Sequence, residues 1–589
     1  MSSLKEQLTS VVASTFVSCG YDPQYGEVMH SSRPDLAQFQ CNGALAAAKA
    51  YHTTPRQVAQ TVLERLAASP IFATVAVAGP GFINLTLTDD YLATYLRDLI
   101  ADEHLGYEQA GRRLKIIVDY GGANVAKPMH VGHLRAAIIG ESLKRLARFA
   151  GHEVLGDVHL GDWGLPMGMI IAELARLHPD WPYFTPAETG PFPAEPPVTI
   201  EELAEIYPAA ARRANEDATA MEAARQATFE LQRGRPGYRA LWQHFVSVSV
   251  AELRRDYQDL NVDFDLWLGE SDTQARIDPL IKRLCDAGYA RESQGALVVD
   301  VTQPGDAREL PPFILVKSDG AVLYGTTDLA TIEQRVQALG THLILYVVDK
   351  RQSTHFEQLF RAAYKTGVAP AGVELEHIDF GTMNGKDGKP FKTREGGVLR
   401  LRTLIEMLTA KAHERLAEIE AAQAYSDEEK NEIARKVGVA TLKFADLANH
   451  RSIDYVFDLE RFSVFEGRTG PYLLYTAVRA RSVLRKADAE RLAPGRLSAP
   501  VDATERNLLL KLAELPDMIN LAFTQRAPNH LCEYAYTLAT MFNRFYHQHH
   551  ILSEKNIEQQ ASWLSVVQYT ARVLEQVLDL LGIDVPERM

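Results

Sequence analysis

Two histidines around a glycine are the residues of this chain best suited to chemistry. His130, Gly132 and His133 stand in the stretch Asp119-Tyr-Gly-Gly-Ala-Asn-Val-Ala-Lys-Pro-Met-His-Val-Gly-His133, together with Lys127. Imidazole and ammonium groups donate hydrogen bonds to anions, and a glycine lets a ligand approach the backbone. The combination indicates a phosphate-binding corner, for which a nucleoside triphosphate is the natural ligand.

The elements around these residues support this interpretation. The β-branched run at Ile116 predicts a buried strand, the Gly-Gly pair predicts a turn, and residues 134–149 have helical spacing. A helix that begins just after a strand points free N–H groups and the positive end of its dipole at an anion. The alternative is a buried strand–helix corner with incidental histidines, which two histidines flanking a glycine disfavour.

Length and composition are those of an ordinary globular protein. The 589 residues are 46% hydrophobic and 23% charged, which suggests roughly three or four domains. No apolar run reaches the roughly 18 residues of a membrane helix, and the N-terminus has no signal or transit pattern. The four cysteines form no Cys-x-x-Cys pair, so neither zinc nor disulfides are indicated. We expect a cytoplasmic protein without membrane contact.

The net charge of −14 does not by itself exclude a nucleic-acid partner, because phosphate binding requires only a local basic surface. Residues 461–496 have such a bias, with eight Lys and Arg against three Asp and Glu. A solvated helix face would have the same composition. The segment is therefore a candidate for nucleic-acid contact that needs a second argument.

Three regions differ in pattern. Residues 1–110 combine a helical stretch from Pro55 with two strands around Gly79-Pro-Gly81, which predicts a small N-terminal α/β domain. Residues 111–453 alternate strands with helices, which predicts a Rossmann-like domain with a parallel, doubly wound sheet. Its expected strands begin at Lys115 and lie at 153–156, 296–301, 343–348 and 378–380. Residues 454–589 show no clear strand signal and predict an all-α domain.

The strand–helix alternation is interrupted at about 180–260. Residues 181–198 are rich in proline, and the capping box Thr199-Ile-Glu-Glu202 then opens a helical stretch to about Leu260. We predict an inserted helical segment here. A second capping box, Ser426-Asp-Glu-Glu429, predicts a helix that leads towards the C-terminal domain.

Four motifs along the chain carry a family resemblance. They are Asp119 to Arg135, His159-Leu-Gly-Asp-Trp-Gly164, Phe465-Glu-Gly-Arg-Thr-Gly-Pro-Tyr-Leu-Leu-Tyr475, and the ending Leu580-Leu-Gly-Ile-Asp-Val-Pro-Glu-Arg-Met589. A His-x-Gly-His corner in a doubly wound domain resembles the class I aminoacyl-tRNA synthetases, and the four motifs in this order resemble the arginyl-tRNA synthetases. The resemblance covers essentially the whole chain.

The resemblance implies a reaction and its partners. Arginyl-tRNA synthetases ligate L-arginine to tRNA(Arg) through an arginyl-adenylate, using ATP and releasing pyrophosphate and AMP. His130, Gly132 and His133 would bind ATP, with the histidines donating to phosphate oxygens where charge builds up. Mg²⁺ is expected only as the ion that ATP carries, and no protein-bound metal is predicted.

The second signature of the family, usually Lys-Met-Ser-Lys, departs from that form here. Phe391-Lys-Thr-Arg394 stands at its position, and the second lysine is missing. In family members with this departure, the lysine upstream of His-x-Gly-His is thought to compensate, and that position is Lys127. We therefore expect Lys127, Lys392 and Arg394 to share the pyrophosphate charge and to be catalytic along with both histidines. The alternative for the loop is a polar turn, since Gly385-Lys-Asp-Gly-Lys389 has good turn chemistry.

The amino-acid pocket follows from the chemistry of arginine together with the resemblance. A guanidinium offers five donors in a planar fork, and its burial requires carboxylate acceptors. The resemblance implies that Glu270, Tyr324 and Asp328 surround the guanidinium, and that Asn124 and Gln352 hold the α-amino and carboxylate end. Tyr324 and Asp328 would share one face if a helix begins there.

The resemblance implies four further contacts. His355 would approach the adenosine and Met383 would cover the adenine, although His355 could equally satisfy a backbone carbonyl. Phe82 would stack on a base of the tRNA corner and Asn84 would hydrogen-bond a base edge; Phe82 in the domain core is the alternative. The helical C-terminal domain resembles the family's anticodon-binding domain, which would explain the basic segment 461–496.

The sequence also disfavours other classes of protein. A cysteinyl enzyme would need zinc-binding cysteines, and a glutamyl or glutaminyl enzyme would not need Glu270 and Asp328. The complete corner disfavours a catalytically inactive tRNA-binding protein, and the two additional domains disfavour a small-molecule nucleotidyltransferase. We expect tRNA(Arg), L-arginine and ATP as partners and a monomeric chain.

Overall fold

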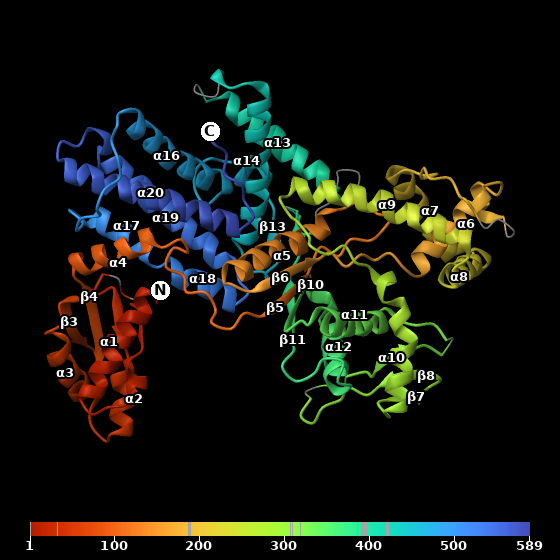
Figure 1. The fold of residues 1–589 in the computed structure, drawn as a ribbon, viewed down its shortest axis with the longest axis horizontal. Helices are drawn as coiled ribbons and strands as arrows, with labels where there is room; N and C mark the ends of the chain where they lie inside the picture. Colours follow the sequence, from red (N-terminus) through yellow and green to blue (C-terminus); the bar gives the residue numbers. More distant parts are fainter. Residues whose placement is uncertain are drawn as a thin grey trace. The chain divides into compact units, whose positions relative to one another are not determined.

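The computed structural model describes residues 2–31, 33, 35–185, 190–306, 308, 310–318, 320–385, 387–389, 399–419 and 423–589. The chain divides into two compact units (Figure 1). One unit comprises Met1–Ala110, Val464–Leu580 and Val585–Met589, and the other comprises Gly111–Ser463 and Leu581–Asp584. Within the described residues, no helix combines the length and apolarity that crossing a membrane requires.

A four-stranded parallel sheet is the centre of the second unit. Its order is β11 (Glu374–Phe380), β10 (Leu343–Asp349), β5 (Lys115–Asp119), β6 (Glu153–Asp157). Ile117 and Ile344 share a hydrophobic core with α11 (Tyr324–Leu339) and α12 (Ser353–Lys365) on one face. Because side chains alternate along a strand, Ile116 and Val118 point to the other face, against which α5 (Val131–Phe149) packs. The predicted parallel, doubly wound architecture is confirmed.

The strand expected at 296–301 was placed in the wrong sheet. β8 (Ala296–Val299) pairs antiparallel with β7 (Ala290–Ser293) and with β9 (Phe313–Val316) in a separate three-stranded sheet. The physical reason is the two-residue turn Gln294-Gly295, in which both residues have positive φ, 51° and 77°. Such a turn closes an antiparallel hairpin, whereas parallel neighbours need a crossover of a dozen or more residues.

Four helices, α6 to α9, form a helical lobe of the second unit (Figure 1). They are α6 (Leu165–Leu177), α7 (Ile200–Glu216), α8 (Ala218–Gln232) and α9 (Pro236–Asp259). The predicted capping box at the start of α7 is present, with the Thr199 hydroxyl accepting from Glu202 N–H and the Glu202 carboxylate accepting from Thr199 N–H. The apolar side chains of the lobe also cover Val125 and Ala126, which lie just upstream of His130.

The described residues of this unit form seven further helical elements. They are η2 (Pro182–Phe184), η3 (Glu270–Thr273), α10 (Gln274–Asp286), η4 (Lys350–Gln352), α13 (Leu401–Ala417), α14 (Asp427–Leu447) and α15 (Leu459–Phe462). The Ser426 hydroxyl caps α14, as predicted, by accepting from Glu429 N–H. A two-residue strand β13 (Tyr455–Val456) pairs with β12 (Met383–Asn384), although no strand signal was recognised after 454. Two residues are too short for a periodic pattern.

A buried arginine forms ion pairs with the carboxyl ends of two parallel strands. Arg335 of α11 is 1% exposed, and its Nη2 lies 2.6 Å from Asp119 Oδ2 and 2.7 Å from Asp157 Oδ2. Asp119 ends β5 and Asp157 ends β6. Because removing one partner of a buried pair costs about 3–5 kcal/mol, this contact fixes the sheet edge from which the next segments leave.

The first unit combines a small α/β domain with a helical domain. Its sheet has the antiparallel order β1 (Val28–His30), β2 (Phe39–Cys41), β4 (Phe82–Leu87), β3 (Phe72–Ala78). The helices of the N-terminal part are α1 (Leu4–Ser18), η1 (Pro23–Gly26), α2 (Gly43–Ala50), α3 (Pro55–Leu66) and α4 (Asp89–Ala101). The expected strands around Gly79-Pro-Gly81 and the expected helix from Pro55 are confirmed.

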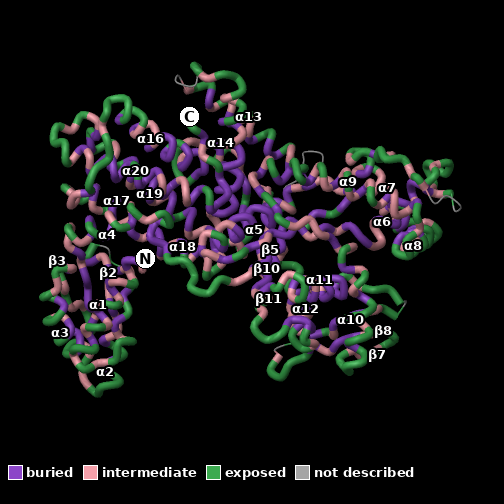
Figure 2. The backbone as a smooth tube through the Cα atoms, in the orientation of Figure 1, coloured by how far each residue is buried: buried purple, intermediate pink, exposed green. Residues whose placement is uncertain are grey.

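The C-terminal part of this unit is helical, as predicted. It contains α16 (Gly470–Ala489), α17 (Ala503–Ala513), α18 (Leu515–Thr524), α19 (Asn529–Gln548), η6 (Ile551–Ser553) and α20 (Ile557–Leu580). Tyr534, Phe542 and Phe545 are buried in it, so these aromatic rings belong to the core rather than to a stacking surface. Figure 2 shows the buried backbone running through α19 and α20, and likewise through α5 in the other unit.

Candidate active site

The candidate site begins where β5 ends in a glycine turn. Gly121 and Gly122 both have positive φ, 98° and 58°. A Cβ on Gly121 would lie 2.7 Å from the Tyr257 hydroxyl, so only glycine fits this turn. From here an extended link reaches His130 and α5.

His130 and His133 form the N-terminal cap of α5. Gly132 N–H donates to His130 Nδ1 at 3.0 Å, and His130 N–H donates to His133 Nδ1 at 3.3 Å. The two rings stack with centroids 3.9 Å apart and an interplanar angle of 25°. Since each Nδ1 accepts a hydrogen bond, the neutral rings carry their protons on Nε2, where each can donate one hydrogen bond to a ligand.

The electrostatics of this corner keep both rings neutral. Burial, and then the charges of His130 and Lys127, lower the pKa of His133 to about 3. Burial and the Lys127 charge also lower the pKa of His130. Gly132 has a local role as well, because a Cβ there would lie 2.7 Å from Cε1 of the His130 ring.

The Lys127 ammonium lies over an aromatic ring of the helical lobe. Its Nζ is 4.4 Å from the ring centroid of Tyr207, on α7. Its charge lowers the pKa of both histidines, which means that Lys127, His130 and His133 lie close together, as the sequence predicted. The positive end of α5 faces the same place.

Lys392 and Arg394 lie outside the described residues, but both ends of their loop are described. On one side, Gly385 N–H donates to Lys389 O at 2.8 Å, which closes a tight turn. On the other, Leu401 N–H donates to Met129 O at 3.0 Å and Val131 N–H donates to Leu399 O at 3.2 Å. Residues 399–401 therefore run beside the histidine corner, and Met383, just before the loop, is buried on β12.

Asn124 and Glu270 are brought together by a ladder of three extended segments. Asn124 bridges Gly161, and Leu160 bridges Gly269. Val125 N–H donates to Gly161 O at 3.0 Å, and Glu270 N–H donates to Leu160 O at 3.1 Å. These segments continue β5 and β6 beyond the carboxyl edge of the sheet, where ligands bind in such folds.

Tyr324 is the first residue of α11 and Asp328 lies about one turn later, on the same face as predicted. His355 of α12 donates from Nε2 to Asp328 Oδ2 at 2.7 Å, and its ring centroid is 4.9 Å from that of Tyr324. Tyr324 is 62% exposed. His355 thus contacts the predicted arginine-binding residues, while its role at the adenosine stays a prediction.

Two carboxylates share this pocket. η3, which carries Glu270, packs against α11, which carries Asp328. The pKa of Glu270 is raised to about 7, chiefly by burial; His159 lowers it, and the charges of Asp328 and Asp162 raise it. A cation entering the pocket would relieve this repulsion. Gln352, the last residue of η4, is exposed and precedes α12 directly.

Sequence reasoning missed Asp162 as a supporting residue. Its carboxylate accepts from Ser271 N–H at 3.0 Å and from Ser271 Oγ–H at 2.6 Å, and so holds the turn that carries Glu270. Gly269 makes room for it, since a Cβ there would lie 2.5 Å from Asp162 Oδ1. Asp162 is the acidic residue of the motif His159–Gly164, and its place in that motif was the signal that could have indicated it.

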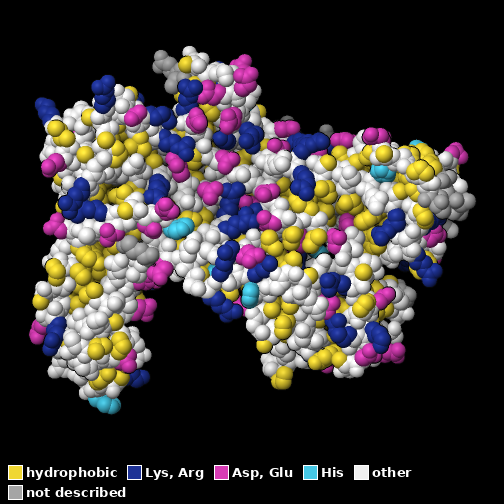
Figure 3. All heavy atoms as spheres, in the orientation of Figure 1, with side chains coloured by type: hydrophobic (Ala, Val, Ile, Leu, Met, Phe, Trp, Pro, Cys, Tyr) yellow, Lys and Arg dark blue, Asp and Glu magenta, His cyan; other side chains and the backbone are white. Residues whose placement is uncertain are grey.

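Phe82 and Asn84 lie in the other unit, on the same face of β4. Asn84 is 8% exposed and its Oδ1 accepts from Gln40 Nε2 at 2.9 Å; Phe82 is half-buried. Several arginines of the segment 461–496 make contacts within their own unit, such as Arg468 with Glu533 at 2.7 Å and Arg479 with Asn543 at 2.6 Å. Figure 3 shows basic side chains interspersed with acidic ones on the visible face.

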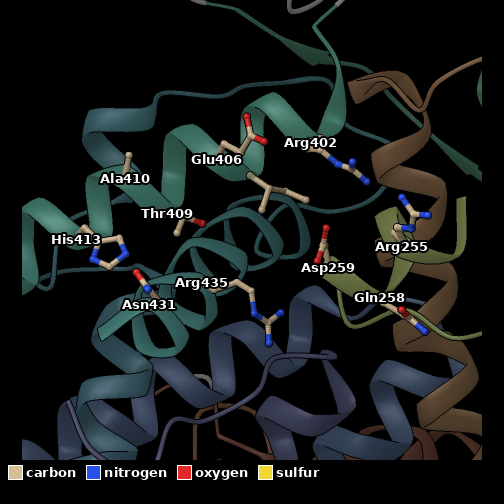
Figure 4. Close-up of a pocket in the computed structure, with 11 residues that line it drawn as sticks. Arg255, Gln258, Asp259, Arg402, Glu406, Thr409, Ala410, His413, Asn431 and Arg435 are labelled. Carbon is tan, nitrogen blue, oxygen red and sulfur yellow. The ribbon is translucent and has the colours of Figure 1, made fainter. Parts of the chain in front are cut away.

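A separate cavity of about 760 Å³ lies between α9, α13 and α14 (Figure 4). Its lining includes Arg255, Arg402, His413 and Arg435, and none of the predicted site residues. Arg402 is engaged there by Asp256 at 2.7 Å and Glu252 at 3.0 Å. Among the described residues, no group of three or more His, Cys, Asp or Glu side chains is arranged to hold a metal ion.

Comparison with known proteins identifies the family of the chain. The family model "tRNA synthetases class I (R), catalytic domain" matches residues 95–459. "Arginyl tRNA synthetase N terminal domain" matches residues 2–87, and "DALR anticodon binding domain" matches residues 473–589. The three matches together span almost the whole chain.

Individual relatives match over their full length. The chain is 53% identical to an arginine–tRNA ligase of Alkaliphilus oremlandii over 590 residues and 47% identical to one of Agathobacter rectalis over 600, covering 100% of each chain in both cases. The solved structure of an arginyl-tRNA synthetase from Plasmodium falciparum superposes with a TM-score of 0.81 at 23% identity, covering 100% of both chains. That structure supports the fold.

Proposed function

The chain belongs to the class I arginyl-tRNA synthetases, and from this premise we propose that the residues around His130 and Glu270 form its active site. The reaction is the ATP-dependent ligation of L-arginine to tRNA(Arg) through an arginyl-adenylate. The observation that carries the assignment of the site is that two contrasting environments, neutral histidine donors and crowded carboxylates, both lie beyond the carboxyl edge of one sheet.

The arginine side chain binds between Glu270, Asp328 and Tyr324. The support for this is the raised pKa of Glu270, which reports a buried carboxylate beside other carboxylates. A guanidinium supplies the missing positive charge and a planar set of donors. Asn124 and Gln352 hold the α-amino and carboxylate end, which places one carboxylate oxygen for attack on the α-phosphate of ATP.

ATP binds at the histidine corner, and the residues there act by position and charge. His130 and His133 donate from Nε2 to phosphate oxygens, Gly132 leaves the helix N-terminus accessible, and Lys127 neutralises pyrophosphate together with Lys392 and Arg394. His355 and Met383 contact the adenosine. Mg²⁺ enters with ATP and supplies further charge neutralisation when bound.

In the second step the arginyl group passes to the 3′-terminal adenosine of the tRNA, and AMP leaves. Phe82 and Asn84 contact the tRNA corner; their position on one face of β4 supports this role. The helical C-terminal domain reads the anticodon, which is consistent with the match of residues 473–589 to an anticodon-binding domain.

Arginine-dependent exchange of pyrophosphate into ATP tests the proposed site. The wild type is expected to exchange only with L-arginine and only with tRNA(Arg) present. Asp328→Asn is expected to weaken arginine use selectively, and His130→Asn to weaken ATP turnover selectively. A variant pair that affects both substrates equally would contradict the division of the site.

The proposal includes a monomeric chain and a cytoplasmic location. All described candidates for ATP and arginine contact come from one unit of one chain, which supports a site complete in the monomer. Sedimentation of the purified chain with and without tRNA tests the oligomeric state, and cell fractionation tests the location.

A further inference from the structure

The Lys127 ammonium has an unusual partner for a group that must neutralise pyrophosphate. Among the described residues, no hydrogen bond or ion pair engages its Nζ, and the contact that it makes is with the face of the Tyr207 ring, 4.4 Å from the centroid. A carboxylate partner would have to be displaced before phosphate could bind. A ring face attracts the charge and leaves N–H donors available for phosphate oxygens.

The helical lobe also contacts the backbone of the segment just before Lys127. Ala126 N–H donates to the Ser249 hydroxyl of α9 at 2.9 Å, in a buried position. Ala126 has a φ of 64°, a left-handed conformation that a residue with a side chain rarely adopts. The backbone just before Lys127 is thus fixed by α9 while the side chain of Lys127 lies on α7. Both contacts come from residues more than seventy positions along the chain.

Tyr207 itself is held firmly. It packs against the hydrophobic cluster that contains Val125 and Leu203, and it is half-buried. The next residue, Pro208, lies inside α7 and has no N–H to donate to the preceding turn. α7 therefore lacks one backbone hydrogen bond next to the ring that meets the ammonium.

We propose that Tyr207 is a positioning residue for ATP activation, whose ring holds the Lys127 ammonium beside His130 and His133. The proposal rests on the proposed function, because it takes Lys127 as the pyrophosphate-binding lysine. It gives the helical lobe a part in the first step of the reaction. Tyr207 touches neither substrate in this account and acts through Lys127.

The test is a double-mutant cycle in the full chain, measured by arginine-dependent pyrophosphate exchange with tRNA(Arg). Tyr207→Leu is expected to lower kcat/KM for ATP by roughly 3- to 30-fold, the range of a cation–π contact, and to leave KM for arginine within about twofold. Tyr207→Phe keeps the ring and should retain wild-type kinetics. In a Lys127→Met background, Tyr207→Leu should add almost nothing, since the contact is already gone.

A matched control is available in the same cluster. Tyr238 is also half-buried there and also lies under a cation, Arg235, at 4.1 Å from its ring centroid. Tyr238→Leu therefore removes the same ring from the same core without touching Lys127, and should leave ATP kinetics near those of the wild type. Thermal melting of each variant checks that it is folded.

Three outcomes would overturn the positioning role. The first is an equal loss from Tyr207→Leu in both backgrounds, which would mark a purely structural effect. The second is unchanged ATP kinetics in Tyr207→Leu, and the third is full activity in Lys127→Met, which would leave nothing to position. Pyrophosphate exchange by the wild type tests the proposed function, and the double-mutant cycle tests the role of Tyr207. Failure of the proposed function and failure of the positioning role are therefore seen in different measurements.

Discussion

The corner around His130 and the pocket around Glu270 lie at the same carboxyl edge of the parallel sheet, but they differ in what holds them. The two histidines of the corner are held by hydrogen bonds between residues two or three positions apart, and both are neutral. The pocket is assembled from four segments far apart in the sequence, and its carboxylates repel one another. The hydrogen bonds of the corner are present without a ligand, whereas the crowded carboxylates favour a bound cation.

This difference predicts that removing a charged group will lower activity most when that group lies in the pocket around Glu270. Glu270→Gln is expected to lower kcat/KM for arginine by roughly 10²- to 10³-fold, since losing one partner of a buried, hydrogen-bonded charge pair costs about 2–5 kcal/mol. KM for ATP should change little. The measurement is pyrophosphate exchange at varied arginine concentration.

The cavity of Figure 4 supplies a control for this variant. Glu406 lines it on α13, apart from every predicted site residue, so Glu406→Gln should leave arginine kinetics unchanged. If Glu270→Gln behaves like Glu406→Gln, the guanidinium binds elsewhere and the contrast between the two regions is lost.

The second prediction concerns the histidine corner. His133→Ala removes one Nε2–H donor and the acceptor of His130 N–H. The kcat for activation is expected to fall by about 10²-fold, the usual effect of removing one preorganised donor, with KM for arginine nearly constant. His413→Ala, in the cavity of Figure 4, is the matched control. A rise in KM for arginine without a fall in kcat would contradict the assignment.

The difference between a locally held corner and a pocket assembled from distant segments also explains what could be predicted from the sequence. The corner is local, so its strand, glycine turn, helix start and four chemical groups follow one another in the sequence and were recognised there. The helix caps formed by Thr199 and Ser426 are equally local. Their signals are contacts over three residues, which a linear pattern contains.

The features that escaped prediction depend on the fold. The hairpin at Gln294-Gly295 needs a positive φ at a glutamine, which composition does not indicate. The ladder that brings Asn124 beside Gly161, and the contact of Lys127 with Tyr207, join segments that only tertiary packing brings together. The arginine-binding residues were therefore identified through a family resemblance, and Asp162 was not identified at all.

The third prediction uses pH to separate the two regions. Because the pKa of Glu270 is raised to about 7 in the free chain, arginine must displace a proton from it below that pH. KM for arginine should therefore rise by up to about tenfold per pH unit as pH falls below 7. His133, with a pKa of about 3, remains neutral above pH 5.5 and should add no pH dependence to KM for ATP there. Kinetics of both substrates between pH 5.5 and 8 provide the measurement, and Glu270→Gln should abolish the slope for arginine. Parallel pH profiles for the two substrates would contradict the contrast.

The smallest effect is expected where the ladder supports Asn124. A Cβ on Gly161 would lie 2.3 Å from Asn124 Oδ1, so Gly161→Ala forces the amide to move. Asn124 is exposed, and its short side chain can turn aside without disturbing the core. We therefore expect KM for arginine to rise by about 3- to 10-fold, as misplacement of a substrate-holding group does, with kcat for activation little changed. Gly111→Ala is the matched control, since a Cβ there meets nothing within 4 Å. An unchanged KM for arginine would mean that Asn124 does not hold the α-amino end. A large fall in kcat would mean that the ladder also positions the histidine corner, and the two regions would then not be independent.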